Sequence, residues 1–413
     1  MGPLDALRKA IGDAARPASD QDSIAGVPAR FVAAPASVAE ASEVVRLAAV
    51  HDLAVVVRGA ATKQAWGAPP RRLDLILDTR RLTGVVEHAA GDLITVVRAG
   101  TPLALLQTTL AEAGQELAID SPFAASTVGG AVAANTSGPR RLAYGTLRDL
   151  VIGVTIVRPD GVVAKSGGKV VKNVAGYDLG KLMTGSFGTL GLIAECAFRL
   201  HPTPPAVACV TSPVAGPTHA AAALAAILGA QVVPSALELN APAGEGWEVA
   251  VRLAGVPDGV PQRADATRIL LGRGAVVEST EPAWLTAYPW GEGDVGLKLT
   301  MALSQTHGLL AAVAAARDNH GAAIALRGSL GTGVLHAGLP GATPPQTVAD
   351  VVDDLRAAAT SAGGHLTVVT APGGTRDLLD LWGPVPGLEL MRRIKERFDP
   401  DARFAPGRFV GGI

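Results

Sequence analysis

Three glycine-rich segments in the first half of the chain have the composition of anion-binding loops. They are VRGAATKQAWG (57–67), STVGGAVAANTSGPRRLAYG (126–145) and GGKVVKNVAGYDLGKLMTGSFGTLGLI (167–193). Successive backbone N–H groups in such turns can converge on an anion, and glycine lets the backbone approach it closely. The first segment matches neither GxxxxGK[ST] nor GxGxxG. One segment alone could be an ordinary turn, but three together indicate an extended, phosphate-bearing ligand along the first domain.

Polar residues within these segments add donors and charge. Asn135, Thr136, Ser137 and Gly138 follow one another in the second segment, and a buried loop of this kind must find hydrogen-bond partners, of which a polar ligand is one. Lysines 165, 169, 172 and 181 lie near the glycines of the third. They could face an acidic group, or they could point into solvent.

The elements around these segments predict an α+β domain over 31–202, after a lead-in at 1–30. Apolar spacing predicts a helix over 36–53, with Ser37 as N-cap and Glu40 at the N3 position. Further elements are predicted as strands at 54–59, 73–78, 92–100 and 188–202, a helix at 101–114, and two strands within 151–168 around a turn at 159–161. This order differs from the strict βαβαβα of a nucleotide-binding Rossmann fold.

The second half predicts another α+β domain, a sheet covered by helices, over 218–381. A proline-rich stretch at 203–217 is interpreted as a linker. The predicted helices are 218–229, 261–274, 306–321 and 343–364, and the predicted strands are 247–255, 297–303, 322–329, 333–339 and 365–371. Residues 382–413 form a C-terminal segment that begins with a helix.

Composition excludes several classes of function. The chain has 413 residues, of which 48% are hydrophobic, so global disorder is excluded. A net charge of −1 and 4% aromatic residues disfavour nucleic-acid binding. Cys196 and Cys209 are the two cysteines, too few to hold an iron–sulfur cluster. The N-terminus predicts no secretory signal, and the charge-free stretch 202–237 is broken by prolines, so we expect no membrane span.

Four motifs, taken in order, resemble the FAD-binding domain of the vanillyl-alcohol oxidase/p-cresol methylhydroxylase superfamily. They are RGAATK (58–63), TVGGAVAANTSGPRRLAYG (127–145), LRDLVIGVTIVRPDGVV (147–163) and KNVAGYDLGKLMTGSFGTLGLI (172–193). The tail, WGPVPGLELMRRIKERFDPDARFAPGRFVGGI (382–413), resembles the C-terminus of the FAD-binding E subunit of bacterial glycolate oxidase. Ala405 stands where that family has asparagine, and the following Pro-Gly-Arg is kept. The resemblance implies a two-part p-cresol methylhydroxylase-type (PCMH-type) FAD domain to which the C-terminal segment returns.

The resemblance also implies a set of FAD-contacting residues. Residues 58–64 would form the pyrophosphate loop, and 127–130 with Asn135, Ser137 and Gly138 would line the diphosphate and the isoalloxazine. Tyr144 and Gly145 would lie near the flavin, and the backbone of Gly191 and Ile193 would approach the adenine end. The implied contacts are Arg58, Gly59, Ala60, Ala61, Thr62, Lys63, Gln64, Pro122, Thr127, Gly129, Gly130, Asn135, Ser137, Gly138, Tyr144, Gly145, Gly191, Ile193 and Arg408. The first loop has no histidine through which some members of the superfamily attach the cofactor, so non-covalent FAD is expected.

The activity implied by the resemblance is oxidation of glycolate to glyoxylate. The chain would work with a second flavin subunit (D) and an iron–sulfur subunit (F), through which electrons would leave. The two cysteines fit this need for a partner. The implied place is the cytoplasm, with any membrane association made through partner subunits.

Oxidation of a small 2-hydroxy acid also needs a base for the hydroxyl proton and a cation for the carboxylate. Candidates on predicted strands are Arg252, Lys298, Arg327 and His336, each of which could instead be a structural residue. Related catalytic subunits carry a GDGN..H segment where this chain reads GSLGTGVLHAG (328–338), and no metal site is predicted. This departure favours a relay or structural subunit. The alternatives are a stand-alone oxidase with its own complete active site, or a reductase on the same flavin domain.

Overall fold

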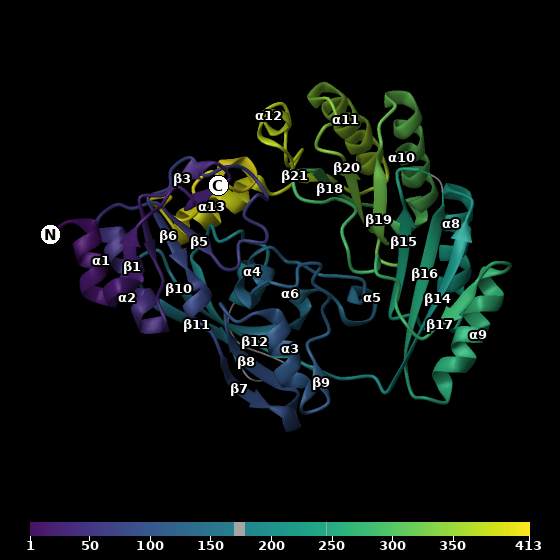
Figure 1. Cartoon of the computed structure of the whole chain (residues 1–413), viewed down its shortest axis with the longest axis horizontal. Helices are drawn as coiled ribbons and strands as arrows, with labels where there is room; N and C mark the ends of the chain where they lie inside the picture. The colour runs from purple at the N-terminus through teal and green to yellow at the C-terminus, as the bar shows by residue number, and fades with distance from the viewer. Residues whose placement is uncertain (169–177, 245) are drawn as a thin grey trace. The chain divides into compact units, whose positions relative to one another are not determined.

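A computed structural model describes residues 1–168, 178–244 and 246–413. Residues 172–177 of the fourth motif, with Lys169, therefore lie outside the described residues. The chain divides into two compact units (Figure 1). Unit 1 comprises Met1–Thr136, Thr146–Thr203 and Val385–Ile413, and unit 2 comprises Ser137–Gly145 and Pro204–Pro384.

The first sheet of unit 1 has four strands in the order β1-β4-β6-β5. Strands β4, β6 and β5 run parallel, and β1 is antiparallel to β4. The elements of this part are α1 (Pro3–Ile11), β1 (Ala15–Pro17), β2 (Ser23–Ile24), β3 (Val27–Pro28), β4 (Phe31–Ala33), α2 (Val38–Val50), β5 (Val55–Arg58) and β6 (Leu75–Asp78). Because β5 and β6 are parallel, their carboxyl ends lie at the same edge of the sheet, where the first glycine-rich segment begins.

The second sheet of unit 1 is antiparallel, in the order β11-β10-β12-β8-β7. Its elements are β7 (Val85–Ala89), β8 (Ile94–Arg98), α3 (Leu103–Ala111), β9 (Gln115–Glu116), α4 (Val128–Ala133), α6 (Leu147–Leu150), β10 (Val151–Val157), β11 (Val163–Gly167), α7 (Leu179–Met183), β12 (Leu192–Arg199) and β13 (His201–Pro202). Buried apolar side chains of α3, α4, α6, β10 and β12 form one core cluster. A second cluster joins α1, α2, β5 and β6.

Local sequence signals explain where several of these elements begin. The Ser37 hydroxyl accepts a hydrogen bond from the Glu40 backbone N–H at 3.1 Å, so α2 starts at the predicted N-cap. Residues 151–168 form the predicted hairpin, with Val157 opposite Val163. The helices and strands predicted between 36 and 115 are present, and β7 is an additional strand.

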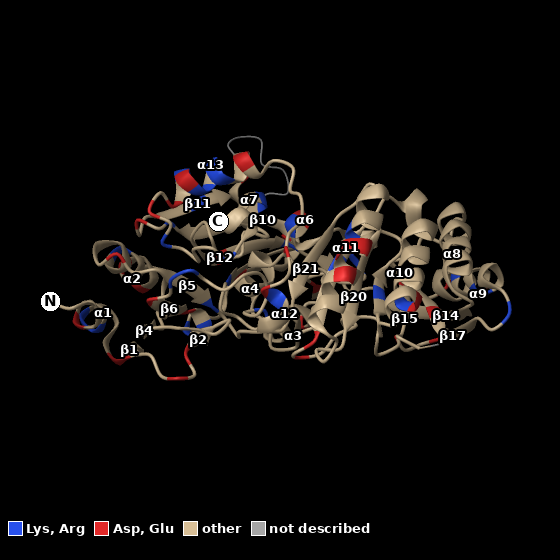
Figure 2. Ribbon diagram, turned by 90° about the horizontal axis from the view of Figure 1, so that it is seen from above, with Lys and Arg blue, Asp and Glu red and all other residues tan. Residues whose placement is uncertain are grey.

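The C-terminal segment belongs to unit 1. Its helix α13 (Leu388–Phe398) ends at Asp399, and Phe404 forms an isolated parallel bridge with Val55 of β5. The buried Lys395 ammonium donates to Asp399 Oδ2 at 2.7 Å and to the carbonyls of Thr189 and Phe404. Charged residues of both signs lie along this helix (Figure 2).

Unit 2 is one antiparallel eight-stranded sheet, in the order β17-β14-β16-β15-β19-β20-β18-β21. Helices α8, α9, α10 and α11 lie side by side along it (Figure 1). The elements are α5 (Arg141–Tyr144), β14 (Ala206–Val214), α8 (Pro217–Gly229), β15 (Ala236–Ala241), β16 (Trp247–Gly255), α9 (Gly259–Leu271), β17 (Val276–Glu278), β18 (Val295–Thr300), α10 (Thr306–His320), β19 (Ala325–Ser329), β20 (Val334–Leu339), α11 (Pro345–Ser361), β21 (Leu366–Thr370) and α12 (Gly373–Arg376).

Three boundaries differ from those predicted. The stretch 203–217 contains β14, which pairs with β16 along its whole length, so only the residues before β14 connect the units. Pro213 is tolerated because β17 pairs only with residues 209–211 on the other side of β14. The lead-in 1–30 packs Leu7 and Ala15 into the core of unit 1, and 137–145 groups with unit 2.

The predicted fold class is confirmed: two α+β parts, the second a sheet covered by helices. Among the described residues, no helix combines the length and apolar character that a membrane crossing requires.

Candidate active site

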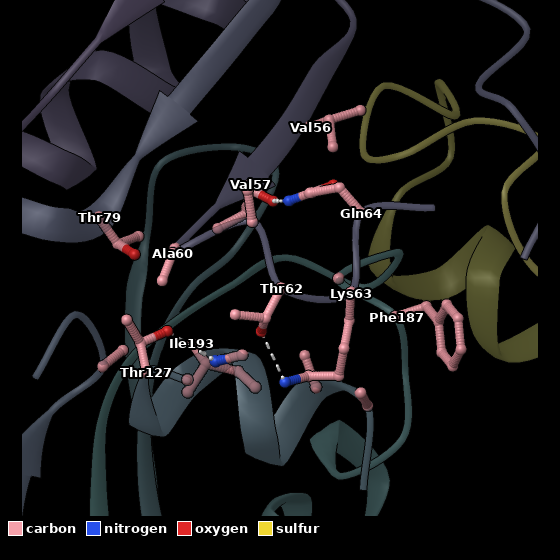
Figure 3. Close-up of a pocket in the computed structure, with 18 of the residues that line it drawn as sticks. Val56, Val57, Ala60, Thr62, Lys63, Gln64, Thr79, Thr127, Phe187 and Ile193 are labelled. Atoms are coloured by element: carbon pink, nitrogen blue, oxygen red, sulfur yellow. Dashed lines mark hydrogen bonds between the residues drawn. The ribbon is translucent and has the colours of Figure 1, made fainter. Parts of the chain in front are cut away.

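Unit 1 contains an open cavity at the carboxyl end of β5. Its wall is built from the loop after β5, the start of α4, and the turn that precedes β12 (Figure 3). The lining residues are Val56, Val57, Gly59, Ala60, Ala61, Thr62, Lys63, Gln64, Trp66, Thr79, Ala99, Thr127, Gly129, Gly130, Ala133, Ala134, Phe187, Gly188, Gly191, Ile193 and Arg408. The cavity therefore joins all three glycine-rich segments with the C-terminal segment.

Glycines in the wall permit close backbone packing. A Cβ at Gly59 would lie 2.3 Å from Thr127 Oγ1, and one at Gly129 would lie 2.7 Å from the Cβ of Ala99. Gly191 has φ +141°, and a Cβ there would lie 2.7 Å from the Val157 carbonyl oxygen. These positions need glycine because any side chain would push the walls of the cavity apart.

The cavity fits an extended cofactor that carries an anionic centre. Its surface is mostly small or apolar, with Lys63 and Arg408 as the charged side chains that line it. Close by, Asn135 Oδ1, Thr136 Oγ1 and Ser186 Oγ are buried oxygens without a hydrogen-bond partner among the described residues. The backbone of Phe187 donates to the Ala133 carbonyl, which joins the segments that carry these oxygens. Orphaned buried oxygens next to a cavity are expected where a polar ligand binds.

The C-terminal segment orders the first loop. The Arg408 guanidinium donates from Nη2 to the carbonyls of Gln64 at 2.8 Å and Trp66 at 2.7 Å. Gln64 Nε2 donates to the Val57 carbonyl at 3.2 Å, as Figure 3 shows. Ala405 has φ +45°, a left-handed conformation in which asparagine is enriched, and its side chain packs in an apolar cluster outside the cavity lining.

The lining includes twelve of the cofactor contacts implied by the sequence. The implied residues that are absent from it are Arg58, Pro122, Asn135, Ser137, Gly138, Tyr144 and Gly145. The last four belong to unit 2. Arg58 differs for an electrostatic reason, because its guanidinium donates to Asp22 at 3.1 Å and to Asp78 at 3.2 Å. A hydrogen bond from Arg16 is the largest cause that lowers the pKa of Asp22 far below its usual value, and the hydrogen bonds from Arg58 add to it.

Several lining residues escaped the sequence analysis, among them Trp66, Thr79 and Phe187. Trp66 is the last residue before the final glycine of the first glycine-rich segment, and Phe187 lies between glycines in the third. The glycine-rich segments could therefore have identified both residues. Phe187 also has φ +56°, which is uncommon for a residue with a side chain. Thr79 directly follows β6, whose parallel pairing with β5 places it beside the loop.

In unit 2, three of the four candidate catalytic residues form one row across adjacent strands. His336 on β20 lies opposite Lys298 on β18 and opposite Arg327 on β19. Directly opposed residues share a face of the sheet. Arg252 lies on β16, two strands beyond β19, and its buried guanidinium pairs with Glu281 at 2.6 Å and with the Ser235 hydroxyl at 2.9 Å. The structure thus gives Arg252 a structural ion pair and separates it from the other three.

Two aromatic residues enclose His336. Tyr288 and Trp290 stack at 4.4 Å between ring centroids, and each meets the imidazole edge-on, at 4.8 Å and 5.7 Å. The opposed glycines Gly296 and Gly338 make room for Trp290, since a Cβ at Gly296 would lie 2.6 Å from its ring. We call Arg141, Tyr288, Trp290, Lys298, Arg327 and His336 the histidine cluster.

Arg327 holds the segment that carries Tyr288 and Trp290 in place. Its Nε donates to Asn240 Oδ1 at 2.9 Å, and its Nη1 donates to the carbonyl of Tyr288 at 3.1 Å. The guanidinium is therefore occupied by protein groups that fix the segment carrying Tyr288 and Trp290. The sequence analysis missed both aromatic residues, although YPW at 288–290 concentrates rings in a chain with 3 tyrosines and 5 tryptophans.

The electrostatics of the cluster are set by burial among positive charges. Burial, and then the charges of Arg141 and Lys298, lower the pKa of His336 well below its usual value, so the imidazole is neutral. Burial, and then Arg141, lower the pKa of Lys298 to about 8. Burial raises the pKa of Tyr288 to about 12. No hydrogen bond or ion pair joins Lys298 to another residue in the described part of the chain. The cluster thus presents positive charge to an anion beside a neutral imidazole.

Comparison with known proteins places both halves of the chain in flavoprotein families. Residues 29–167 match the FAD binding domain family, and residues 297–409 match the C-terminal domain family of FAD linked oxidases. An uncharacterised FAD-linked oxidoreductase of Mycobacterium tuberculosis is 27% identical over 92% of this chain and 91% of that protein.

Two further similarities agree with these matches. Glycolate oxidase subunit GlcE of Escherichia coli K12 is 39% identical over 152 residues, which are 36% of this chain and 43% of that subunit. The fold is similar to that of p-cresol methylhydroxylase, with a TM-score of 0.78 at 16% identity over 98% of this chain and 96% of that one. The chain therefore carries an FAD binding domain and a C-terminal domain of the FAD linked oxidases on a PCMH-type fold, and FAD is its cofactor.

Proposed function

We propose that the chain binds FAD non-covalently in the cavity of unit 1 and oxidises a small 2-hydroxy acid such as glycolate, with the histidine cluster of unit 2 as its substrate site. The observation that carries the proposal is the opposed pair of Lys298 and His336, in which Lys298 forms no ion pair with a described carboxylate. When bound, FAD supplies the two-electron acceptor. The loop contains no histidine between residues 58 and 66, which supports a non-covalent cofactor.

The cluster offers both groups that the reaction needs from the protein. The Lys298 ammonium, with Arg141 as a second positive charge, binds the substrate carboxylate. The neutral imidazole of His336 accepts the hydroxyl proton. A histidine among cations is a weak base, and the arriving carboxylate offsets those charges and raises the pKa of His336. Substrate binding and base strength are thereby coupled.

A second candidate is the relay or structural role in a complex with a flavin (D) subunit and an iron–sulfur (F) subunit. It is supported by the similarity to the E. coli glycolate oxidase subunit and by the sequence at 328–338, which lacks the Asp and Asn of the GDGN..H pattern. In that role another subunit oxidises glycolate. The cationic cluster beside Tyr288 and Trp290 favours the first candidate, since a purely structural subunit has no need of a half-buried lysine that forms no ion pair with a described residue next to a half-buried histidine.

The test is an anaerobic absorption spectrum of the purified, FAD-loaded chain with glycolate. Bleaching of the flavin band supports the first candidate, and an unchanged band in a chain that retains FAD supports the second. Oxalate has two carboxylates and no alcohol carbon that could be oxidised. It therefore serves as a binding probe through its effect on the flavin spectrum. Lys298→Met is expected to weaken glycolate and oxalate binding at least tenfold. Arg268→Met, on the surface of α9, serves as the matched control. Equal affinity in both variants would reject Lys298 as the carboxylate ligand.

A further inference from the structure

The histidine cluster borders a pair of glycines on the same face of the unit 2 sheet. Gly296 on β18 lies opposite Gly338 on β20, in the register that also opposes Lys298 to His336. The two pairs are two residues apart along their strands, which places them on one face at a spacing of about 7 Å. The glycine pair, which we call the glycine notch, is therefore a stretch of sheet without side chains directly beside the cationic pair.

The side chain of Trp290 fills the glycine notch. A Cβ at Gly296 would lie 2.6 Å from Trp290 Cε2, and a Cβ at Gly338 would lie 3.1 Å from Trp290 Cβ. Tyr288 stacks on Trp290 with an angle of 6° between the ring planes. Both rings meet the imidazole of His336 edge-on, so the two rings form an aromatic wall that stands over the notch and reaches His336.

Of the two residue pairs that neighbour Lys298 and His336 along these strands, the glycine notch is the one that leaves space. The pair on the other side is Thr300 and Val334, and both residues carry side chains. The Thr300 hydroxyl accepts a hydrogen bond from the His365 backbone N–H at 2.9 Å, which fixes it to the protein. An indole placed in the notch therefore closes the direction along β18 and β20 in which a bound molecule could otherwise extend.

The aromatic wall is held in place by the protein itself. Arg327 Nη1 donates to the carbonyls of Ala287 at 3.3 Å and Tyr288 at 3.1 Å, and its Nε donates to Asn240 Oδ1 at 2.9 Å. Burial raises the pKa of Tyr288 to about 12, so its phenol is uncharged at neutral pH. The wall is thus a fixed, uncharged surface beside two groups that carry polar chemistry.

We propose that Trp290 sets the chain length of the substrate, so that the site takes short 2-hydroxy acids such as glycolate and lactate and excludes longer ones. An acid held by its carboxylate at Lys298 and by its hydroxyl at His336 cannot extend over the notch, because the indole occupies that space. Trp290 is then a specificity-determining residue that takes no part in proton or hydride transfer. The inference rests on the proposed function, since it assumes that this cluster binds the substrate.

The experiment measures binding of 2-oxo acids to the FAD-loaded chain by isothermal titration calorimetry. These acids keep the carboxylate but have no hydroxyl carbon to oxidise, so binding is measured without turnover. The series is glyoxylate, 2-oxobutyrate and 2-oxohexanoate. Wild type is expected to bind 2-oxohexanoate about tenfold more weakly than glyoxylate, because the longer chain meets occupied space. In Trp290→Ala the order should reverse, with affinity rising by up to about fourfold per added methylene that enters the opened notch.

Two variants control for the loss of a tryptophan as such. Trp290→Phe keeps a ring in the notch and should retain the preference for short acids. Trp284→Ala removes another tryptophan of unit 2, whose Nε1 donates to Glu248 at 2.8 Å, and should bind the series as wild type does. Far-ultraviolet circular dichroism checks that each variant is folded. If Trp290→Ala does not fold, Trp290→Leu replaces it and should shift the preference in the same direction.

The wild-type series already tests the proposal. Wild type that binds 2-oxohexanoate as tightly as glyoxylate would overturn it, and so would a folded Trp290→Ala with the wild-type order of affinities. The result is separate from that of the glycolate experiment. Chain-length selection that depends on Trp290 supports the wall even where glycolate leaves the flavin band unchanged. Bleaching by glycolate without such selection rejects the wall and keeps the oxidation. A wild-type chain that binds none of the three acids rejects both.

Discussion

The neutral state of His336 predicts a specific loss of stability in mild acid. In the folded chain burial, Arg141 and Lys298 hold the pKa of His336 well below its usual value, whereas in the unfolded chain it returns to about 6.5. In mild acid His336 therefore binds a proton in the unfolded state and not in the folded state. The contribution of His336 is complete above about pH 6.5 and decreases as the pH falls below that value, until the folded-state pKa is reached.

The size of the effect follows from linkage. In the unfolded state the pKa of a histidine is about 6.5. Its protonation between about pH 7.5 and pH 5.5 lowers the free energy of unfolding by about 1.4 kcal/mol. Other groups also titrate over this range, so the decisive quantity is the difference between wild type and His336→Gln. The variant should lose about 1.4 kcal/mol less than wild type over the same two pH units.

Urea unfolding at the two pH values measures this difference. Four of the five tryptophans, at 247, 284, 290 and 382, belong to unit 2, so intrinsic fluorescence mainly reports that unit. His307→Gln, at an exposed position of α10, is the control for loss of a histidine as such. If wild type and His336→Gln lose stability in parallel, His336 is not held neutral, and the proposed coupling between substrate binding and its basicity is refuted.

Two further predictions concern unit 1. Asp399→Asn leaves the buried Lys395 without its counter-ion and should lower the free energy of unfolding, measured in urea, by about 3 kcal/mol, and a loss below about 1 kcal/mol would contradict this. Gly191→Ala places a Cβ 2.7 Å from the Val157 carbonyl oxygen at φ +141° and should destabilise the chain by about 1–3 kcal/mol while weakening FAD binding measured by fluorescence. Gly91→Ala, where a Cβ meets nothing within 4 Å, should change neither quantity, and equal effects at both glycines would reject the steric explanation.

Most helices and strands could be predicted because the signals that start and end them lie within a few residues of each element. Ser37 and Glu40 mark the start of α2 through a single backbone-to-side-chain hydrogen bond, which composition and spacing reveal directly. The stretch 203–217 was misread because prolines at both ends suggested a linker. Whether Pro213 is tolerated in β14 depends on β17, which pairs only with residues 209–211 of that strand, and no local pattern contains this information.

Site residues that lie within one sequence motif could be predicted. Site residues that only the register of the sheet brings together could not. The loop 59–64 could be assigned from its glycines and from the resemblance. Arg252, Lys298, Arg327 and His336 looked alike in sequence, as polar residues on strands. Only the strand order separates Arg252 from the others, and only hydrogen bonds to the Tyr288 carbonyl reveal Arg327 as a positioning residue.

Lys63 and Lys298 are two lysines whose pKa values are lowered by partial burial. Each lies in a different unit, each has a pKa lowered to about 8 chiefly by burial, and neither forms an ion pair with a described residue. Lys395 is more deeply buried, and Asp399 compensates its charge within the fold. A half-buried lysine without a carboxylate costs stability and persists where a ligand supplies the missing anion. On this reasoning Lys63 and Lys298 are the candidate anion-binding residues of the two units.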